Sequence, residues 1–207
     1  AQAMKFMLII VAPIAFVLLF LSQDILKLYL GEDLALKTAP ILKLVAIGFL
    51  MEALGSIAHN YVLSLGYPNK VAKLHIIELP LYAGLAFWFT SGMGIQGMAL
   101  AWLIRRILEA SYVFFLLQWA IPQNIRTLIS NGIGRATAVT AALALFIAIA
   151  SWAIHPNSLV WITVSMGMIA YGILVWSKVF SLAERKGLTS MIREIRVSAM
   201  PKGGDTW

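Results

Sequence analysis

Several charged side chains lie inside long apolar stretches of this chain, and Glu52, Arg105, Arg106 and Glu109 among them require an explanation. A charge at the centre of a membrane helix costs roughly 2.5–3.5 kcal/mol on insertion scales. A charge kept at that cost usually pairs with another, faces a water-filled cavity or marks a substrate path. The donor fork of arginine suits phosphate. We therefore expect the function of the protein to involve these residues.

The spacing of the charges predicts how they pair. Arg105 and Glu109 are four residues apart, so they can pair along one helix. If that pair forms, Arg106 needs Glu52 or an anionic ligand as its partner. Glu52 and His59 could instead form a path for protons or ions, because histidine titrates near neutral pH. For Glu52 three hypotheses stay open: an ion pair, proton coupling, or a hydrogen bond to a neighbouring helix.

At about 100° per residue, the charged stretches have a polar face and an apolar face. One face of Gly97–Trp119 holds Trp102, Arg105, Arg106, Glu109 and Tyr112. We expect the opposite face to contact lipid through Leu100, Leu103, Ile107 and Phe114. Glu52 and His59 share a face with three small residues expected at a helix contact, namely Gly48, Gly55 and Ser56. His75 and Glu78 align near a helix end, where we expect snorkelling or packing. The predicted substrate cavity contains Trp102, Arg105, Arg106, Glu109 and Glu52.

Six apolar stretches must position these residues. They are Phe6–Ser22, Pro40–Leu63, Leu74–Ser91, Gly97–Trp119, Ala136–Ile154 and Leu159–Ser177. A bilayer core needs roughly 17–25 helical residues, and a segment in lipid is a helix because its amides have no water partner. Hydrophobic residues make up 61% of the chain and charged residues 12%, too few for a soluble surface. The prediction is an all-α polytopic membrane protein of six transmembrane helices, with a bundle over residues 1–180.

Several functional classes are excluded. Without cysteine, the chain has no disulfide, thiolate metal site or cysteine nucleophile. Its three histidines are scattered and no enzyme signature occurs, so we predict no enzyme, metal or cofactor. Gly92–Gly97 matches a dinucleotide-binding pattern, but it follows an apolar stretch rather than a strand, and its glycines fit a tight connection. The net charge of +7 comes from residues flanking the apolar stretches, so nucleic acid is not an expected partner.

The basic residues predict the orientation. Eleven of the sixteen Lys and Arg fall on the side of both chain ends, three on the other side, and the remaining two are Arg105 and Arg106. This asymmetry places both ends in the cytoplasm. The outer loop, Gln23–Ala39, is expected to hold a short surface helix that stops at Gly31, with Pro40 in the first turn of the next helix. The basic tail, residues 181–207, is expected to form a surface helix over Leu182–Val197. It either contacts membrane lipids or anchors the topology.

Several sequence strings together resemble a known family. In chain order, these strings are LYLGED, APILKLVAIG, LSLGYPNKVAK and GIQGMALAWLI. This succession, within Phe6–Trp119, is similar to the C-terminal half of lipid-linked oligosaccharide (O-antigen type) flippases. These belong to the multidrug/oligosaccharidyl-lipid/polysaccharide exporter superfamily.

The resemblance implies two helical bundles around a central cavity and transport by alternating access. It implies that this chain is the second bundle, that an amino-terminal bundle of the same protein is missing, and that the protein lies in the bacterial inner membrane. The implied substrate is an undecaprenyl-diphosphate-linked oligosaccharide that moves to the outer leaflet, with Arg105 and Arg106 as cavity residues. The alternatives are a cation-coupled multidrug exporter of the same superfamily and a non-transporting scaffold of glycan assembly.

Overall fold

The structure is a computed structural model that describes residues 2–120, 134–153 and 157–180. The described residues form helices and turns and contain no strand, which confirms the all-α prediction. The helices are α1 (Gln2–Phe20), α2 (Ser22–Leu30), α3 (Glu32–Ser64), α4 (Pro68–Met93), α5 (Ile95–Ala120), α7 (Gly134–Ala153) and α8 (Asn157–Leu174). A π-helical turn, Val175–Val179, continues α8.

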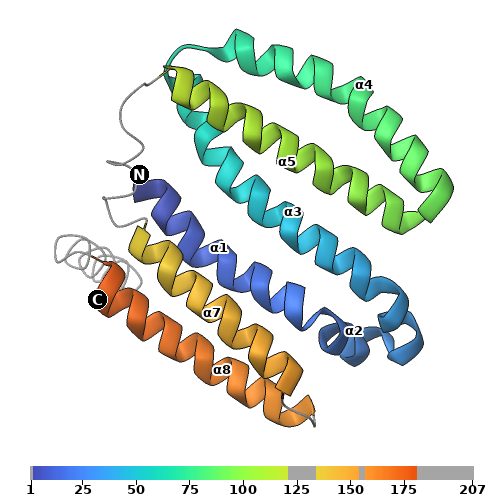
Figure 1. Ribbon diagram of the computed structural model, residues 1–207, viewed down its shortest axis with the longest axis vertical. Helices are drawn as coiled ribbons and strands as arrows, with labels where there is room; N and C mark the ends of the chain where they lie inside the picture. The colour runs from blue at the N-terminus through green and yellow to red at the C-terminus, as the bar shows by residue number, and fades with distance from the viewer. Residues whose placement is uncertain (1, 121–133, 154–156, 181–207) are drawn as a thin grey trace, which may run out of the picture.

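Six long helices lie side by side in the order α4, α5, α3, α1, α7 and α8, and each packs against the next (Figure 1). Consecutive long helices along the chain run in opposite directions, and the two ends of the described chain lie at the same end of the bundle. Lys5 Nζ donates a hydrogen bond to the carbonyl of Val179 at 3.1 Å and ties these ends together. An even number of passes through the bundle accounts for this arrangement.

Four of the helices are long and apolar enough to cross a membrane. They are Glu32–Ser64, Pro68–Met93, Gly134–Trp152 and Leu159–Val179. A fifth span is added if Lys5–Phe20 and Ser22–Leu30 count as one span bent by 70°. Four or five of the six predicted spans therefore have the length and composition of a membrane helix. The exception is α5, which is 26 residues long but has Arg105, Arg106 and Glu109 near its middle.

The predicted outer loop is more helical than expected. A short helix does end before Gly31, whose φ of +80° is in the region that favours glycine. The next helix, however, begins at Glu32 instead of Pro40, so the prediction of Pro40 in the first turn is wrong. Glu32 and Asp33 occupy that first turn, where their negative charge favours a helix N-terminus. The predicted tail helix, Leu182–Val197, lies outside the described residues.

The connection between α4 and α5 explains the glycines of Gly92–Gly97. Gly94, with a φ of +61°, is the single residue between the two helices. A Cβ on Gly97 would clash with the carbonyl of Phe89, so only glycine allows the helices to approach this closely. This agrees with the interpretation of the motif as a tight connection.

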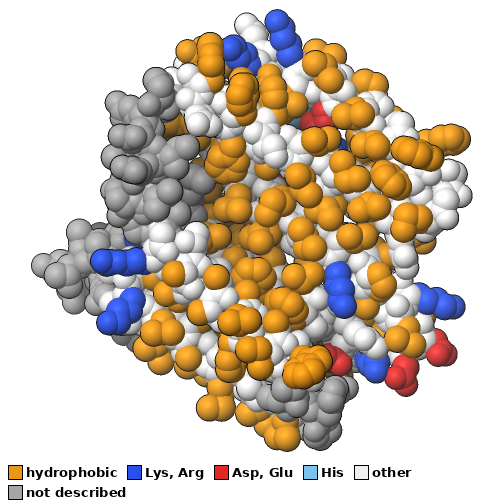
Figure 2. Space-filling model, in the orientation of Figure 1, with side chains coloured by type: hydrophobic (Ala, Val, Ile, Leu, Met, Phe, Trp, Pro, Cys, Tyr) orange, Lys and Arg blue, Asp and Glu red, His pale blue; other side chains and the backbone are white. Residues whose placement is uncertain are grey.

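Packing divides the bundle into two apolar clusters. One joins α1, α7 and α8 around Leu21, Ile147 and Val164, and the other joins α3, α4 and α5 around Val62 and Val113. Apolar side chains also cover much of the face shown in Figure 2. A face rich in apolar side chains suits lipid contact, because it gains nothing from exposure to water. The second cluster borders the charged residues of the predicted site.

Candidate functional site

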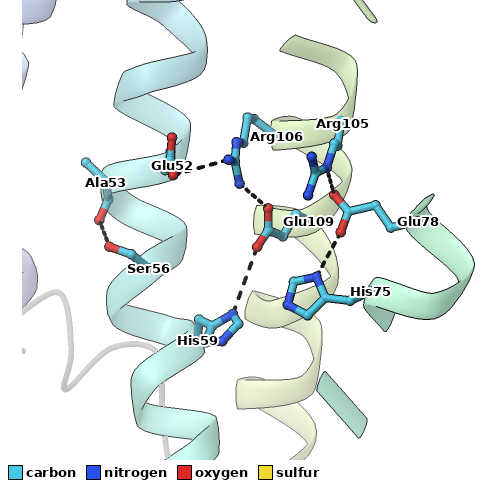
Figure 3. A network of polar contacts seen from close by, with 9 residues as sticks. All are labelled: Glu52, Ala53, Ser56, His59, His75, Glu78, Arg105, Arg106 and Glu109. Carbon is cyan, nitrogen blue, oxygen red and sulfur yellow. Dashed lines mark hydrogen bonds and ion pairs between the residues drawn. The ribbon is translucent and has the colours of Figure 1, made fainter. Parts of the chain in front are cut away.

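Helices α3, α4 and α5 bring seven ionisable side chains close to one another (Figure 3). We call this group the polar cluster. It consists of Glu52, His59, His75, Glu78, Arg105, Arg106 and Glu109. Helix α5 packs against both α3 and α4, so its arginines can reach carboxylates on either side.

Small residues allow α3 and α5 to approach closely. A Cβ on Gly48 would overlap the ring of Trp102, and a Cβ on Gly55 would lie 3.2 Å from the Cβ of Ala110. Close contact through glycine is a common way of packing membrane helices. The packing predicted for Gly48 and Gly55 is therefore confirmed. Ser56 donates to the carbonyl of Ala53 in its own helix instead of bridging two helices.

Arg106 is held by carboxylates from two helices. Its Nη1 donates to Glu109 Oε2 at 2.6 Å, and its Nη2 lies 3.3 Å from Glu52 Oε1. The guanidinium carbon lies 5.5 Å from the ring centroid of Trp102, a cation–π distance. The buried Nε has no hydrogen-bond partner among the described residues. Of the predicted pairs, the one between Arg106 and Glu52 is confirmed as a contact, and Arg106 keeps one donor to spare.

Arg105 has a different partner from the one predicted. Its Nε donates to Glu78 Oε1 at 2.7 Å, and the guanidinium lies 5.1 Å from the ring of Tyr82. The predicted pair with Glu109 is wrong, because Glu109 pairs with Arg106 three residues before it. Both arginines therefore bridge helices, Arg105 from α5 to α4 and Arg106 from α5 to α3.

Glu78 and His75 are the members of the polar cluster that the predicted site did not include. The Glu78 side chain is only 5% exposed, and its second oxygen lies 3.1 Å from His75 Nδ1. Of the two roles expected for these residues near a helix end, snorkelling does not describe Glu78, whereas packing does, because Glu78 is buried between α4 and α5. The sequence contained a signal for Glu78, because placing a carboxylate within an apolar stretch costs as much insertion free energy as placing the arginines that it could neutralise.

The two histidines are neighbours in space although they are distant in sequence. Their ring centroids are 5.5 Å apart. His59 Nδ1 lies 3.9 Å from Glu109 Oε1, so Glu109 is the carboxylate in contact with His59, while Glu52 and His59 line the same cavity. The interpretation of the histidines as scattered therefore does not hold for His59 and His75. The third histidine, His155, lies outside the described residues.

The prediction that Leu103 on α5 faces lipid is wrong. Leu103 is buried, with 7% of its surface exposed, whereas Ile107 is exposed as predicted. Phe114 packs against the cluster around Val113 and is only partly exposed. The reason is that α5 lies between α3 and α4, so it has two packed sides instead of one.

A cavity of about 260 Å³ lies beside the polar cluster, between α3 and α5. Its lining includes Glu52, His59, Arg106 and Glu109, together with the small residue Gly55. Charges in a low-dielectric surrounding interact strongly with any ligand that excludes water. The cavity is therefore suited to a small charged group, such as a phosphate or a cation.

Long apolar helices around a charged cavity are typical of proteins that move polar or charged substances across membranes. Over 118 residues, the chain is 32% identical to a Shigella flexneri protein whose description ascribes O-antigen transport to it. The match covers 57% of this chain and 27% of that relative, so the chain spans about a quarter of the relative's length. No protein-family model and no solved structure matches the chain.

This similarity confirms, over part of the chain, the resemblance to O-antigen type flippases that the sequence strings predicted. The relative is described as a transporter, which agrees with the prediction that this chain is not an enzyme. The apolar helices and the match to this relative together support a membrane protein.

Proposed function

We propose that the chain is part of a flippase that moves an undecaprenyl-diphosphate-linked oligosaccharide from the cytoplasmic to the outer leaflet of the bacterial inner membrane. Transport by alternating access requires a polar site that opens to each side in turn. In this proposal the polar cluster forms one wall of that site, and an amino-terminal bundle of the same protein forms the other. Similarity to an O-antigen transporter supports the substrate class.

The observation that carries the proposal is the position of Arg106 on the cavity wall. Its Nε is buried and has no partner within the described part of the chain, and its contact with Glu52 is the longer of its two ion pairs. The Glu52 side chain is 41% exposed, so it can leave Arg106 at little cost. A diphosphate oxygen could then take the place of Glu52. Arg105 has a supporting role in this proposal, because buried Glu78 already holds it.

The role of Arg106 is tested by replacing it with alanine and with lysine. We expect Arg106→Ala to lower glycan export at least tenfold, and Arg106→Lys to retain part of it, because lysine offers charge without the donor fork. Arg126→Ala removes the same charge between α5 and α7 and is the control. Export by Arg106→Ala equal to that of the control, at equal membrane levels, would contradict the proposal.

We further propose that α5 is a membrane span, which makes six spans with both ends in the cytoplasm. The charges on α5 face carboxylates on α3 and α4, so they need not meet lipid. A single cysteine at Asn69, near the start of α4, is expected to react only from the cytoplasm, and one at Gly92, near its end, only from outside. Both positions are exposed, and the chain has no cysteine of its own. Labelling of a cysteine at Asn69 from outside intact cells would contradict the proposed orientation.

A cation-coupled multidrug exporter is the second candidate, and the charge of the polar cluster favours it. Three carboxylates, those of Glu52, Glu78 and Glu109, face two guanidinium groups, which leaves one formal negative charge. An exporter of this kind predicts drug resistance that depends on Glu52 and no defect in surface glycan. A non-transporting scaffold needs no such cavity, and it predicts normal glycan export with Arg106→Ala.

A further inference from the structure

We propose that His59, His75 and Glu109 bind a divalent transition-metal ion of the zinc class, which links α3, α4 and α5. The proposal is independent of the transported substrate. Two imidazoles and one carboxylate are a ligand set that zinc uses in proteins with a water or another ligand in the open position. Imidazole nitrogen also favours transition metals over Mg²⁺ and Ca²⁺, which prefer oxygen ligands.

The three side chains are placed for this role by three different helices. Each offers one ligand atom, and these atoms lie within 4.8 Å of one another. Around a tetrahedral zinc with bonds of about 2.0–2.1 Å, ligand atoms are about 3.3 Å apart. Binding therefore requires each distance between two ligand atoms to shorten by at most about 1.5 Å. The His75 side chain is 41% exposed and the His59 side chain 24% exposed, so both have room for this rotation.

The neighbouring residues hold two of the ligands in a suitable orientation. Glu78 lies 3.1 Å from Nδ1 of His75, which directs the other ring nitrogen, Nε2, away from Glu78 and leaves it available to a metal. A carboxylate behind a metal-binding histidine is the common second partner in zinc sites. Arg105 fixes Glu78 in turn. Arg106 occupies one oxygen of Glu109 and leaves the other, Oε1, facing His59.

The charge of the polar cluster is compatible with a cation at this place. With neutral histidines, three carboxylates and two guanidinium groups leave a formal charge of −1. A dication changes this charge to +1. Metal binding would thus hold the three helices together and make the cavity beside Arg106 more attractive to an anion.

The test uses the full chain, purified in detergent without a polyhistidine tag and freed of metal with a chelator. Co²⁺ reports the site through its visible absorption, and Zn²⁺ is then titrated to displace it. We expect one metal ion per chain, binding at least tenfold weaker in His59→Ala and in His75→Ala, and no competition from Mg²⁺. His155→Ala removes the third histidine of the chain and is the matched control, expected to bind as the wild type does.

Three results would overturn the proposal: no stoichiometric binding by the wild type, equal affinity in all variants, or a loss confined to His155→Ala. His59→Gln and His75→Gln, which keep a polar side chain, repeat the test if an alanine variant does not elute as a single species. A second readout is the melting temperature, which Zn²⁺ should raise in the wild type and the control but not in the two ligand variants.

Discussion

The ion pair between Glu78 and Arg105 should be the most costly contact of the polar cluster to break. Glu78→Gln keeps the size of the side chain and removes its charge. Arg105 then stays partly buried between α4 and α5 without a direct carboxylate partner, because Glu109 forms its ion pair with Arg106. The same change at Glu52 is the matched control. There Arg106 keeps Glu109, and the Glu52 side chain is 41% exposed.

The expected magnitudes differ severalfold. Removing one partner of a buried ion pair costs about 3–5 kcal/mol, and an unpaired arginine within a membrane helix costs about 2.5–3.5 kcal/mol. Both estimates indicate a loss of about 3 kcal/mol for Glu78→Gln. An exposed pair contributes about 0.2–1 kcal/mol, so Glu52→Gln should lose less than about 1 kcal/mol. The double variant Glu78→Gln/Arg105→Gln should recover at least half of the loss, since it removes the unpaired charge.

The free energy of unfolding can be measured by titrating the protein in mixed micelles with SDS while following tryptophan fluorescence, for which the chain offers seven tryptophans. The order of the variants matters more than their absolute values. A loss for Glu78→Gln no larger than that for Glu52→Gln would refute the reasoning. A double variant less stable than Glu78→Gln would also refute it, because the cost would then not come from the unpaired arginine.

Two further predictions concern packing in each half of the bundle. Gly48→Ala places a methyl group against the ring of Trp102 and should destabilise the protein by about 1–3 kcal/mol. Gly84→Ala, where the added Cβ meets open space, should be neutral or slightly stabilising. Equal melting temperatures of the two variants would contradict the contact between Gly48 and Trp102. Tyr171→Phe removes a hydroxyl that donates to the carbonyl of Ile9 at 3.2 Å, and it should lower the free energy of unfolding by about 1 kcal/mol. Tyr29→Phe, at an 83% exposed position, is the control and should change nothing measurable in the same titration.

The sequence alone was sufficient to predict the helices and most of their limits. Long apolar stretches must be helical in lipid, since their backbone has no other way to satisfy its hydrogen bonds. Gly31 and Gly94 mark turns because few other residues adopt a positive φ. The start of α3 at Glu32 was missed, because an amphipathic stretch before Pro40 resembles a surface loop in composition. Gly48 could be assigned to a helix contact, because a small residue among larger ones is a local feature.

Only the tertiary structure decided which charges meet. The spacing of Arg105 and Glu109 permits a pair within one helix, yet Arg105 reaches Glu78 on α4, whose position no spacing along α5 could indicate. His59 and His75 lie on the consecutive helices α3 and α4, but whether their rings meet depends on how both helices pack against α5. Periodicity shows which residues share a face of one helix. It does not show the neighbouring helix or its register, since both depend on how side chains from distant parts of the chain fit together.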